Sequence, residues 1–492
     1  MKKLLKTIVL TALHALVILL VPLNIYVCDI DEAVALGASA LWLIIMQLLF
    51  WKKTQKKAGW IALDILIFAF MFEQVMIDPY WNGMSQRLEA FEKHCDGEQI
   101  LSCSEALDDF DTAMKYLKRI HPLTYKGLPE DVEEKVLQVR KNIEGRENIA
   151  TYELSREIES VFAMFDDGHT HCDEEYADPH YMKYSYINRK AGLKISGING
   201  ISFEEFLDKY PGLVSYETES YGVKLLKTRI STLEGLRYLG VDINGEITYN
   251  YVDENGENVD FPVTAADFLT LDEYYDFASA QTGEDLRAAD EDRGFVYYDI
   301  DEENSLAVLT LNSCNYNDTY KKTLSEMFKE VKEKGIRNVA VDLRNNPGGS
   351  SMVADEFITY LPANEYKSWA SEWRMNYFMI PFKQEMIKNK HKSDIFDGNV
   401  YILTSVASYS AAMDFAMLIK DNGLGTIIGE PCGNLPASYG EVVCYRLPHS
   451  GLYMQLSEKS WHRVDTSKED EPIMPDISCP ADEAMDVLKE AL

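Results

Sequence analysis

The sequence lacks the cysteine spacings of a disulfide framework or a zinc ribbon. None of its eight cysteines forms a C-x-x-C pair, which argues against a cysteine-ligated zinc module. Free, buried thiols are therefore expected overall, although Cys95 and Cys103 are close enough in sequence to close a short disulfide loop in an extracytoplasmic segment. The cysteines are Cys28, Cys95, Cys103, Cys172, Cys314, Cys432, Cys444 and Cys479.

Positive charge is also scarce. The 492 residues contain 48 Lys and Arg against 80 Asp and Glu, which gives a formal net charge of −32. A surface of this sign repels phosphate backbones, so nucleic acid is not expected as a partner. The length and an apolar content of 46% predict two or three folded units with sizeable cores.

Long apolar runs occupy the first eighty residues. Residues 7–27 and 33–51 contain no Asp, Glu, Lys or Arg, and residues 60–77 contain only Asp64 and Glu73. A bilayer is crossed by about 20 apolar residues, so residues 1–80 are predicted to be a membrane domain with three transmembrane helices in contact with lipid. The third is the least apolar. Lysines before the first run and between the second and third predict a cytoplasmic N-terminus. The chain after residue 78 is then extracytoplasmic, attached to the cell membrane by several spans.

The rest of the chain shows three patterns. Apolar residues at three- and four-residue spacing predict a helical bundle over 85–165, and short β-prone runs with N-G turns predict a β-rich lobe within 166–290. The acidic stretch 266–294 is expected to be an exposed connection. Over 295–485, strands and helices alternate, which predicts a layered α/β core with a largely parallel sheet. Ligands of such sheets bind at the carboxyl ends of the strands.

Two strand ends carry residues suited to chemistry. In NVAVDLRNNPGGS, residues 338–350, an apolar strand runs into Gly348 and Gly349, whose amides can face outward and hold a developing oxyanion. In TSVASYSAAMDFAM, residues 404–417, serines stand between a strand and a helix. Local physics leaves Ser408 and Ser410 equally plausible as a nucleophile, and it favours a helix cap for either one.

Taken together, DLRNNPGG, S-x-S-A-A and GTIIGEPCG resemble the tail-specific (C-terminal processing) and tricorn-core family of serine peptidases, over roughly residues 295–480. The resemblance implies a crotonase/ClpP-like layered core, a peptide or protein substrate and no cofactor. It places the nucleophile at Ser410 and the oxyanion-hole amides at Gly349 and Ala411, with Gly348 as the adjacent alternative. Met413 stands where the family has a glutamate.

The resemblance also indicates which residue acts as the general base for the serine. The tail-specific branch uses a lysine after its GE-x-T segment, where this chain has Asn434 and Leu435. The tricorn-like branch uses a histidine instead, and MFDDGHTHC, residues 164–172, resembles its D-G-H-T element. The resemblance therefore implies His169 as the base, with Thr170 helping to orient it and His171 as the competitor.

The resemblance implies an acidic residue as the third catalytic group, beside the serine and the histidine. It is expected shortly before EPIMPDI, residues 471–477. Glu469 lies at about the distance that the family has, and the missing Gly-Val of the family motif leaves Asp470 and Glu471 open as alternatives.

The combined prediction is a membrane-anchored serine endopeptidase that works through an acyl-enzyme. One alternative is a catalytically inactive protein of the same fold that binds peptides or hydrophobic ligands. Another is a zinc-dependent hydrolase that uses His169 and His171, since imidazoles next to a thiol are zinc ligands. The turn in GLKISGING also resembles that of PDZ domains, which many family members carry before their core.

Overall fold

The computed structural model describes most of the chain after residue 94 and parts of the N-terminal segment. Its contacts divide the chain into two units, Met1–Leu88 with Met375–Phe378, and Glu89–Arg374 with Met379–Leu492. Each unit is described here by itself. The described residues are 8–9, 12–13, 16–17, 32–50, 58–69, 71–72, 95–286 and 294–492.

The N-terminal unit is helical where it is described. Helix α3 spans Glu32–Phe50, residues 58–69 are also helical, and Val17, Leu43, Ile67 and Met71 form a small buried cluster. The predicted spans 7–27, 33–51 and 60–77 each lie partly outside the described residues. Among the residues that are described, no helix has both the length and the apolar character needed to cross a membrane.

A six-stranded sheet forms the core of the larger unit. Neighbouring strands are parallel except for the first pair, which is an antiparallel hairpin, so the predicted α/β core with a largely parallel sheet is confirmed. In order across the sheet the strands are β10 (Val296–Asp301), β11 (Leu306–Leu311), β12 (Asn338–Asp342), β17 (Asn399–Thr404), β18 (Thr426–Gly429) and β21 (Ile477–Ser478).

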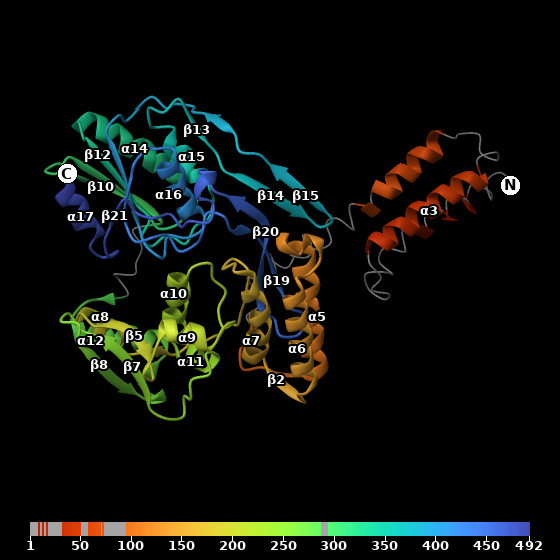
Figure 1. Cartoon of the computed structure of the whole chain (residues 1–492), viewed down its shortest axis with the longest axis horizontal. Coiled ribbons are helices and arrows are strands. Elements are labelled where there is room, and N and C mark those ends of the chain that lie inside the picture. The colour runs from red at the N-terminus through yellow and green to blue at the C-terminus, as the bar shows by residue number, and fades with distance from the viewer. Residues whose placement is uncertain are drawn as a thin grey trace. The chain divides into compact units, whose positions relative to one another are not determined.

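Helices cover both faces of this sheet (Figure 1). Val339 and Val341 pack in one core cluster and Ala340 in another, as expected for alternate residues of a strand. The first cluster contains helices α14 (Asp318–Lys334), α15 (Met352–Ile358) and α16 (Ala411–Asp421), and the second contains α17 (Ala484–Ala491). Burial on both faces explains the continuously apolar strands of the sequence.

Strands β12 and β17 are parallel neighbours, with Asp342 beside Leu403. The loops that follow them therefore open at the same edge of the sheet, as the sequence predicted for the two candidate motifs.

A second, antiparallel sheet carries the histidine segment. Its central strand β20 (Tyr453–His462) pairs with β19 (Tyr439–Arg446) and β14 (Ala370–Met375), while β15 (Phe378–Phe382) follows β14. The short strand β3 (His171–Asp173) also pairs with β20. This pairing ties the turn at residues 166–170 to a sheet built from the C-terminal part of the chain.

Three helices occupy the segment where a bundle was predicted. They are α5 (Cys103–Ile120), α6 (Glu130–Glu144) and α7 (Thr151–Phe162), with a two-stranded sheet of β1 (Ile100–Ser102) and β2 (Asn148–Ala150). Helix α5 begins with a capping box between Ser102 and Glu105.

The β-rich lobe contains the sheet β6-β5-β7-β8, made of Ile201–Ser202, Lys194–Ile198, Ile247–Val252 and Asn258–Val263. Its helices include α8 (Ser185–Lys190), α9 (Phe203–Lys209), α10 (Glu219–Arg229) and α11 (Leu233–Tyr238). The acidic stretch 266–294 is not merely a connection, because it contains helix α12 (Leu271–Thr282). That helix begins where the backbone N–H of Thr270 donates to the Glu273 carboxylate at 3.1 Å.

Candidate active site

Ser410 joins β17 to α16 in a strained backbone conformation. Its φ of 54° and ψ of −126° lie in a region that residues other than glycine rarely adopt. The surrounding structure holds it there, since the Ser410 backbone N–H donates to Asn434 Oδ1 at 2.8 Å. The Ser410 side chain makes no capping hydrogen bond to the helix. The local prediction that this side chain caps the helix is therefore wrong. Strained strand-to-helix turns of this kind are typical of nucleophilic serines.

The other two serines of the motif use their hydroxyls for structure. Ser408 Oγ donates to the Leu343 carbonyl at 2.8 Å and accepts from the Ser405 N–H at 2.9 Å. Ser405 Oγ donates to the Arg344 carbonyl. Among the described residues, the Ser410 hydroxyl has no hydrogen-bond partner. The structure thus separates Ser410 from its neighbours, which the local sequence did not.

The glycine loop after β12 packs directly against the serine turn. A Cβ on Gly348, whose φ is +109°, would lie 2.6 Å from Ser410 Cβ and 3.1 Å from the Ala411 nitrogen. The Gly348 amide itself donates to Asn346 Oδ1 at 2.8 Å, which removes Gly348 as an oxyanion donor. The amides of Gly349 and Ala411 have no acceptor among the described residues, so both are free to hold an oxyanion.

Asn346 organises this region, and the sequence analysis missed it. The side chain is fully buried, and its Nδ2 donates to the Leu311 carbonyl at 2.8 Å. Its own carbonyl accepts from the Tyr409 N–H at 3.0 Å. Asn346 therefore connects the end of β11, the glycine loop and the serine turn. The sequence signal that could have identified Asn346 was the asparagine pair after the strand, within DLRNNPGG.

His169 lies in the turn before β3, and the fold brings it to the serine turn. The Gln455 side chain donates to the His169 carbonyl at 2.9 Å, and Thr170 Oγ1 accepts from the Ser457 N–H at 3.1 Å. Thr170 thus anchors the turn to β20. The His169 and Tyr409 rings are 4.8 Å apart, with Nδ1 at 3.4 Å from the Tyr409 hydroxyl. Tyr409 immediately precedes Ser410.

The two ring nitrogens of His169 have different surroundings. Nδ1 lies 3.6 Å from Asp167 Oδ1 and 3.9 Å from Glu217 Oε1, whereas Nε2 is buried without a hydrogen-bond partner. A proton on Nδ1, facing the carboxyl groups, leaves on Nε2 the lone pair that a general base needs. No hydrogen bond joins His169 to Ser410 among the described residues. In free enzymes such bonds are often long and shorten when substrate binds.

Asp167 is the ionised carboxylate beside this histidine. It accepts from His121 Nε2 at 3.2 Å and from the His169 N–H at 3.0 Å. The proton of His121 is on Nε2 because its Nδ1 accepts from the Leu123 N–H at 3.2 Å. Burial alone would raise the pKa of Asp167, but the hydrogen bonds from His121 and His169 outweigh it and hold this pKa well below its usual range.

Glu217 is the second carboxyl group, and it was not predicted. Its pKa is raised well above the usual value, first by burial and then by the charge of Asp167. The Tyr409 hydroxyl donates to it at 3.0 Å. The two neighbouring carboxyl groups therefore have pKa values that are shifted in opposite directions, that of Asp167 downward and that of Glu217 upward. No motif surrounds Glu217 in the sequence, whereas Asp167 belongs to the D-G-H-T element.

Glu469 does not take part in this cluster. Its carboxylate binds His462 Nδ1 at 2.7 Å. Among the described residues, Glu469 makes no hydrogen bond or ion pair with Asp167, His169 or Glu217. Glu469, with Asp470 and Glu471 as its alternatives, therefore stays a prediction that the structure does not bring to His169. The carboxyl groups beside His169 belong to Asp167 and Glu217.

The zinc interpretation also finds no support. His171 Nδ1 lies 2.6 Å from Asp173 Oδ2. The ligand-type atoms that gather within 4.8 Å of one another belong to Asp167, His169 and Glu217. Within the described residues, His169 and His171 therefore do not form a shared ligand set.

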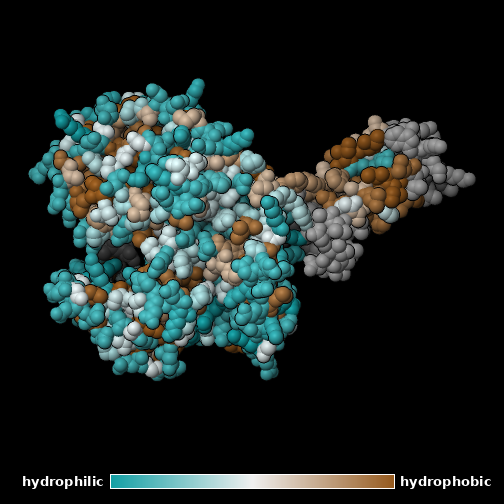
Figure 2. Space-filling view, viewed as in Figure 1, coloured by the Kyte–Doolittle hydropathy of each residue, from teal (hydrophilic) through white to brown (hydrophobic). Residues whose placement is uncertain are grey.

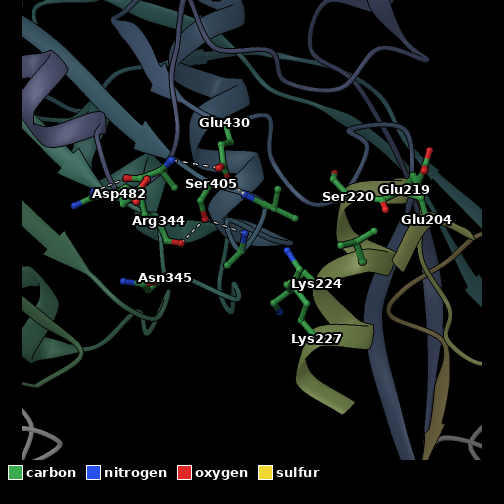
Figure 3. A pocket seen from close by; sticks show the side chains of 14 residues that line it. Glu204, Glu219, Ser220, Lys224, Lys227, Arg344, Asn345, Ser405, Glu430 and Asp482 are labelled. Atoms are coloured by element: carbon green, nitrogen blue, oxygen red, sulfur yellow. Dashed lines mark hydrogen bonds between the residues drawn. The ribbon is translucent and has the colours of Figure 1, made fainter. Parts of the chain in front are cut away.

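A cleft of about 810 Å³ opens beside these loops (Figure 3). One wall is helix α10 of the β-rich lobe. The other is built from the two strand-end loops, through Arg344 and Asn345 after β12 and Ser405 to Ala407 after β17. The space is large enough for several residues of a peptide, and it borders the loops that carry Ser410 and Gly349.

Part of the chain matches a known peptidase family, and a solved structure shares its fold. Residues 305–479 match peptidase family S41. Mature CPAF complexed with lactacystin has the same fold, with 12% identity over 79% of this chain and 98% of that chain and a TM-score of 0.55. The photosystem II D1 C-terminal processing protease matches with 12% identity over 77% of this chain and 93% of that chain, at a TM-score of 0.41.

No protein of curated function matches the sequence. At 12% identity, the likeness to mature CPAF shows the fold alone. The assignment therefore rests on the family match together with the motifs at its two strand ends. The match over residues 305–479 indicates a core of peptidase family S41, the family of tail-specific and tricorn-like peptidases, and the enzyme class that it indicates is serine-type peptidase.

Proposed function

We propose that this protein is a membrane-anchored serine endopeptidase in which Ser410 is the nucleophile and His169 the general base. The observation that carries the proposal is the pairing of a strained Ser410 with a histidine whose buried Nε2 lacks a partner. The two residues come from distant parts of the chain, and the His169 ring contacts Tyr409, the residue that precedes Ser410.

In the proposed mechanism, His169 Nε2 takes the hydroxyl proton of Ser410 as its oxygen attacks a peptide carbonyl. The Gly349 and Ala411 amides stabilise the tetrahedral oxyanion. The protonated imidazole then gives its proton to the leaving amine, and an acyl-enzyme remains. Water activated by the same imidazole hydrolyses this ester and regenerates the serine. Asp167 and Glu217 position the imidazole and stabilise its positive charge.

The membrane part of the proposal is supported by the sequence and by the surface of the N-terminal unit. Leu41, Ile44 and Leu48 of helix α3 are 57%, 56% and 73% exposed, and Figure 2 shows hydrophobic residues over much of this unit. Gln47 meanwhile donates to Asp64, which is buried. Apolar side chains outside and polar ones inside suit a helical unit in lipid. The lysine distribution places the peptidase outside the cytoplasm.

Peptide hydrolysis by the Ser410→Ala variant tests the catalytic proposal. Purified full-length protein in detergent is expected to cleave internally quenched peptides, and the variant is expected to lose about a thousandfold or more in kcat/KM. Ser393→Ala, a substitution at an exposed serine, serves as the matched control. Undiminished hydrolysis by Ser410→Ala would remove the proposal. Peptide binding without any hydrolysis by the wild-type protein would favour an inactive binding protein.

Reporter fusions after residue 78 test the membrane topology. A reporter that is active only outside the cytoplasm is expected to be active at this position, and one that requires the cytoplasm is expected to be silent. The reverse result would place the peptidase in the cytoplasm and remove the third span.

A further inference from the structure

Helix α10 lines the cleft with two lysines. Ser220, Val223, Lys224 and Lys227 recur at helical spacing and face the cleft. Figure 3 shows Lys224 and Lys227 extending from α10 toward the strand-end loops, whereas Glu204, Glu219 and Ser220 lie at the other end. Lysine charge therefore gathers at the part of the cleft that borders the catalytic loops.

The other charged groups near these loops are already engaged. The Arg344 guanidinium binds Asp342 at 2.7 Å and the Ala481 carbonyl at 2.7 Å. The Glu430 carboxylate accepts from the Val406 and Ala481 amides. Asp482 lies 3.7 Å from Lys194. The native structure thus satisfies these groups without using either cleft lysine.

Lys224 and Lys227 have no such partner. Among the described residues, no carboxylate lies within ion-pair distance of either amine. Lys224 is half-buried, and burial lowers its pKa. A half-buried ammonium without an anion favours binding one. The Lys224 amine lies 4.8 Å from the centre of the Tyr221 ring, which stacks on Tyr409 at 4.2 Å. Two aromatic rings therefore link this amine to the residue before Ser410.

We propose that Lys224 and Lys227 form a carboxylate-binding subsite of the substrate cleft, so that the peptidase prefers peptides with a carboxylate near the scissile bond. The subsite rests on the proposed function for its place in catalysis. The carboxylate can come from an Asp or Glu side chain or from the C-terminus of the peptide. Glu204 and Glu219, at the other end of the cleft, repel a second carboxylate there and limit the preference to the lysine end.

Direct peptide binding to the full-length Ser410→Ala variant tests the subsite without turnover. Four fluorescein-labelled peptides carry either Glu or Gln at one internal position and either a free or an amidated C-terminus. Fluorescence anisotropy is expected to show about tenfold tighter binding for one carboxylate source, and the effect should weaken as salt is raised. The Glu/Gln pair and the free/amidated pair distinguish the two sources.

Variants assign the preference to the two lysines. In the background of Ser410→Ala, the double change Lys224→Gln and Lys227→Gln is expected to bring the affinity ratio to about one. The double change Lys224→Glu and Lys227→Glu should reverse it in favour of a Lys-bearing peptide. Lys209→Gln is the matched control, because Lys209 also contacts an aromatic ring, at 5.3 Å from the centre of Tyr210, but does not line this cleft.

Equal binding of all four peptides would overturn the subsite, and so would a preference that survives both double variants. A carboxylate preference with no hydrolysis by the wild-type protein would support the subsite and contradict the proposed peptidase function. Hydrolysis without any preference would contradict the subsite alone.

Discussion

The serine side and the histidine side of the site are built in different ways. The serine side consists of two loops that follow neighbouring parallel strands, and its key residues lie close to recognisable motifs. The histidine side is assembled from His121, Asp167, His169 and Glu217, which belong to the bundle, the turn before β3 and the β-rich lobe. A parallel sheet thus supplies one half of the site by local geometry, whereas the other half exists only once distant segments have packed.

The two sides also differ in their electrostatics. The serine side relies on backbone amides and on a strained turn held by Asn346 and Asn434. The histidine side relies on buried ionisable groups, of which Asp167 has a lowered pKa and Glu217 a raised one. The serine side should therefore be sensitive to the space around the backbone, and the histidine side to the loss of single charged groups.

Apart from the loss of the nucleophile itself, the largest effect is expected on the histidine side. His169→Ala removes the general base, so kcat should fall by about 10²–10⁴-fold. His462→Ala is the control, because that histidine also lies against a carboxylate, Glu469, but makes no hydrogen bond with Asp167, Glu217 or Tyr409 among the described residues. Steady-state peptide hydrolysis measures both. Equal activity in the two variants would show that His169 is not the base.

On the serine side, Gly348→Ala tests the contact between the two loops. Gly348 and Gly127 have nearly the same φ, +109° and +110°, but a Cβ at Gly127 meets no atom within 4 Å. Both alanine variants strain the backbone and should lose stability. Only Gly348→Ala should also displace Ser410, with a loss of about 10²-fold in kcat. Full kcat in Gly348→Ala, alongside a Tm loss like that of Gly127→Ala, would contradict the account.

A smaller effect separates the two candidate acidic residues. Glu217→Gln weakens the support of the imidazolium and is expected to lower kcat about tenfold, with little change in KM, because one hydrogen-bonded carboxyl group is worth about 1 kcal/mol. Glu469→Gln should leave kcat unchanged. The opposite ranking would restore Glu469 as the acidic member and would require a different arrangement around His169.

The smallest expected effect concerns stability and pH. Burial, together with the charge of Asp355, raises the pKa of Asp414 in helix α16 to about 7. A carboxyl group whose pKa is raised on folding stabilises the protein below its unfolded pKa, and this contribution is lost as pH rises toward 7. Asp414→Asn should therefore raise Tm relative to the wild type by about 2 °C or more at pH 8, and by less at pH 5.

Thermal unfolding at the two pH values measures this difference, with Asp397→Asn at an exposed position as the control. The pKa of Asp167, on the histidine side, is shifted in the opposite direction on folding. Its lowered pKa stabilises the fold above the unfolded value, and this contribution is lost in acid. A Tm gain in Asp414→Asn that is the same at both pH values would show that Asp414 is ionised throughout.

The sequence was sufficient for the α/β core and for the place of the two strand-end motifs, because each depends on residues close together in the chain. Ser410 and His169 came from the family resemblance and stay predictions. Glu217 could not be found, because it meets His169 only through the packing of the β-rich lobe. Glu469 was chosen by its distance along the sequence, and in the structure its carboxylate binds His462 instead of His169. Asn434 was noted only as the place of a missing lysine, yet its side chain holds the Ser410 amide.

The most direct test of the central claim is covalent labelling with a fluorophosphonate followed by mass spectrometry of the modified peptide. The wild-type protein is expected to carry one adduct per chain, on Ser410, and His169→Ala is expected to lose most of the labelling rate. An adduct on Ser405 or Ser408, or a labelling rate that does not change in His169→Ala, would contradict the assignment of Ser410 as a nucleophile activated by His169.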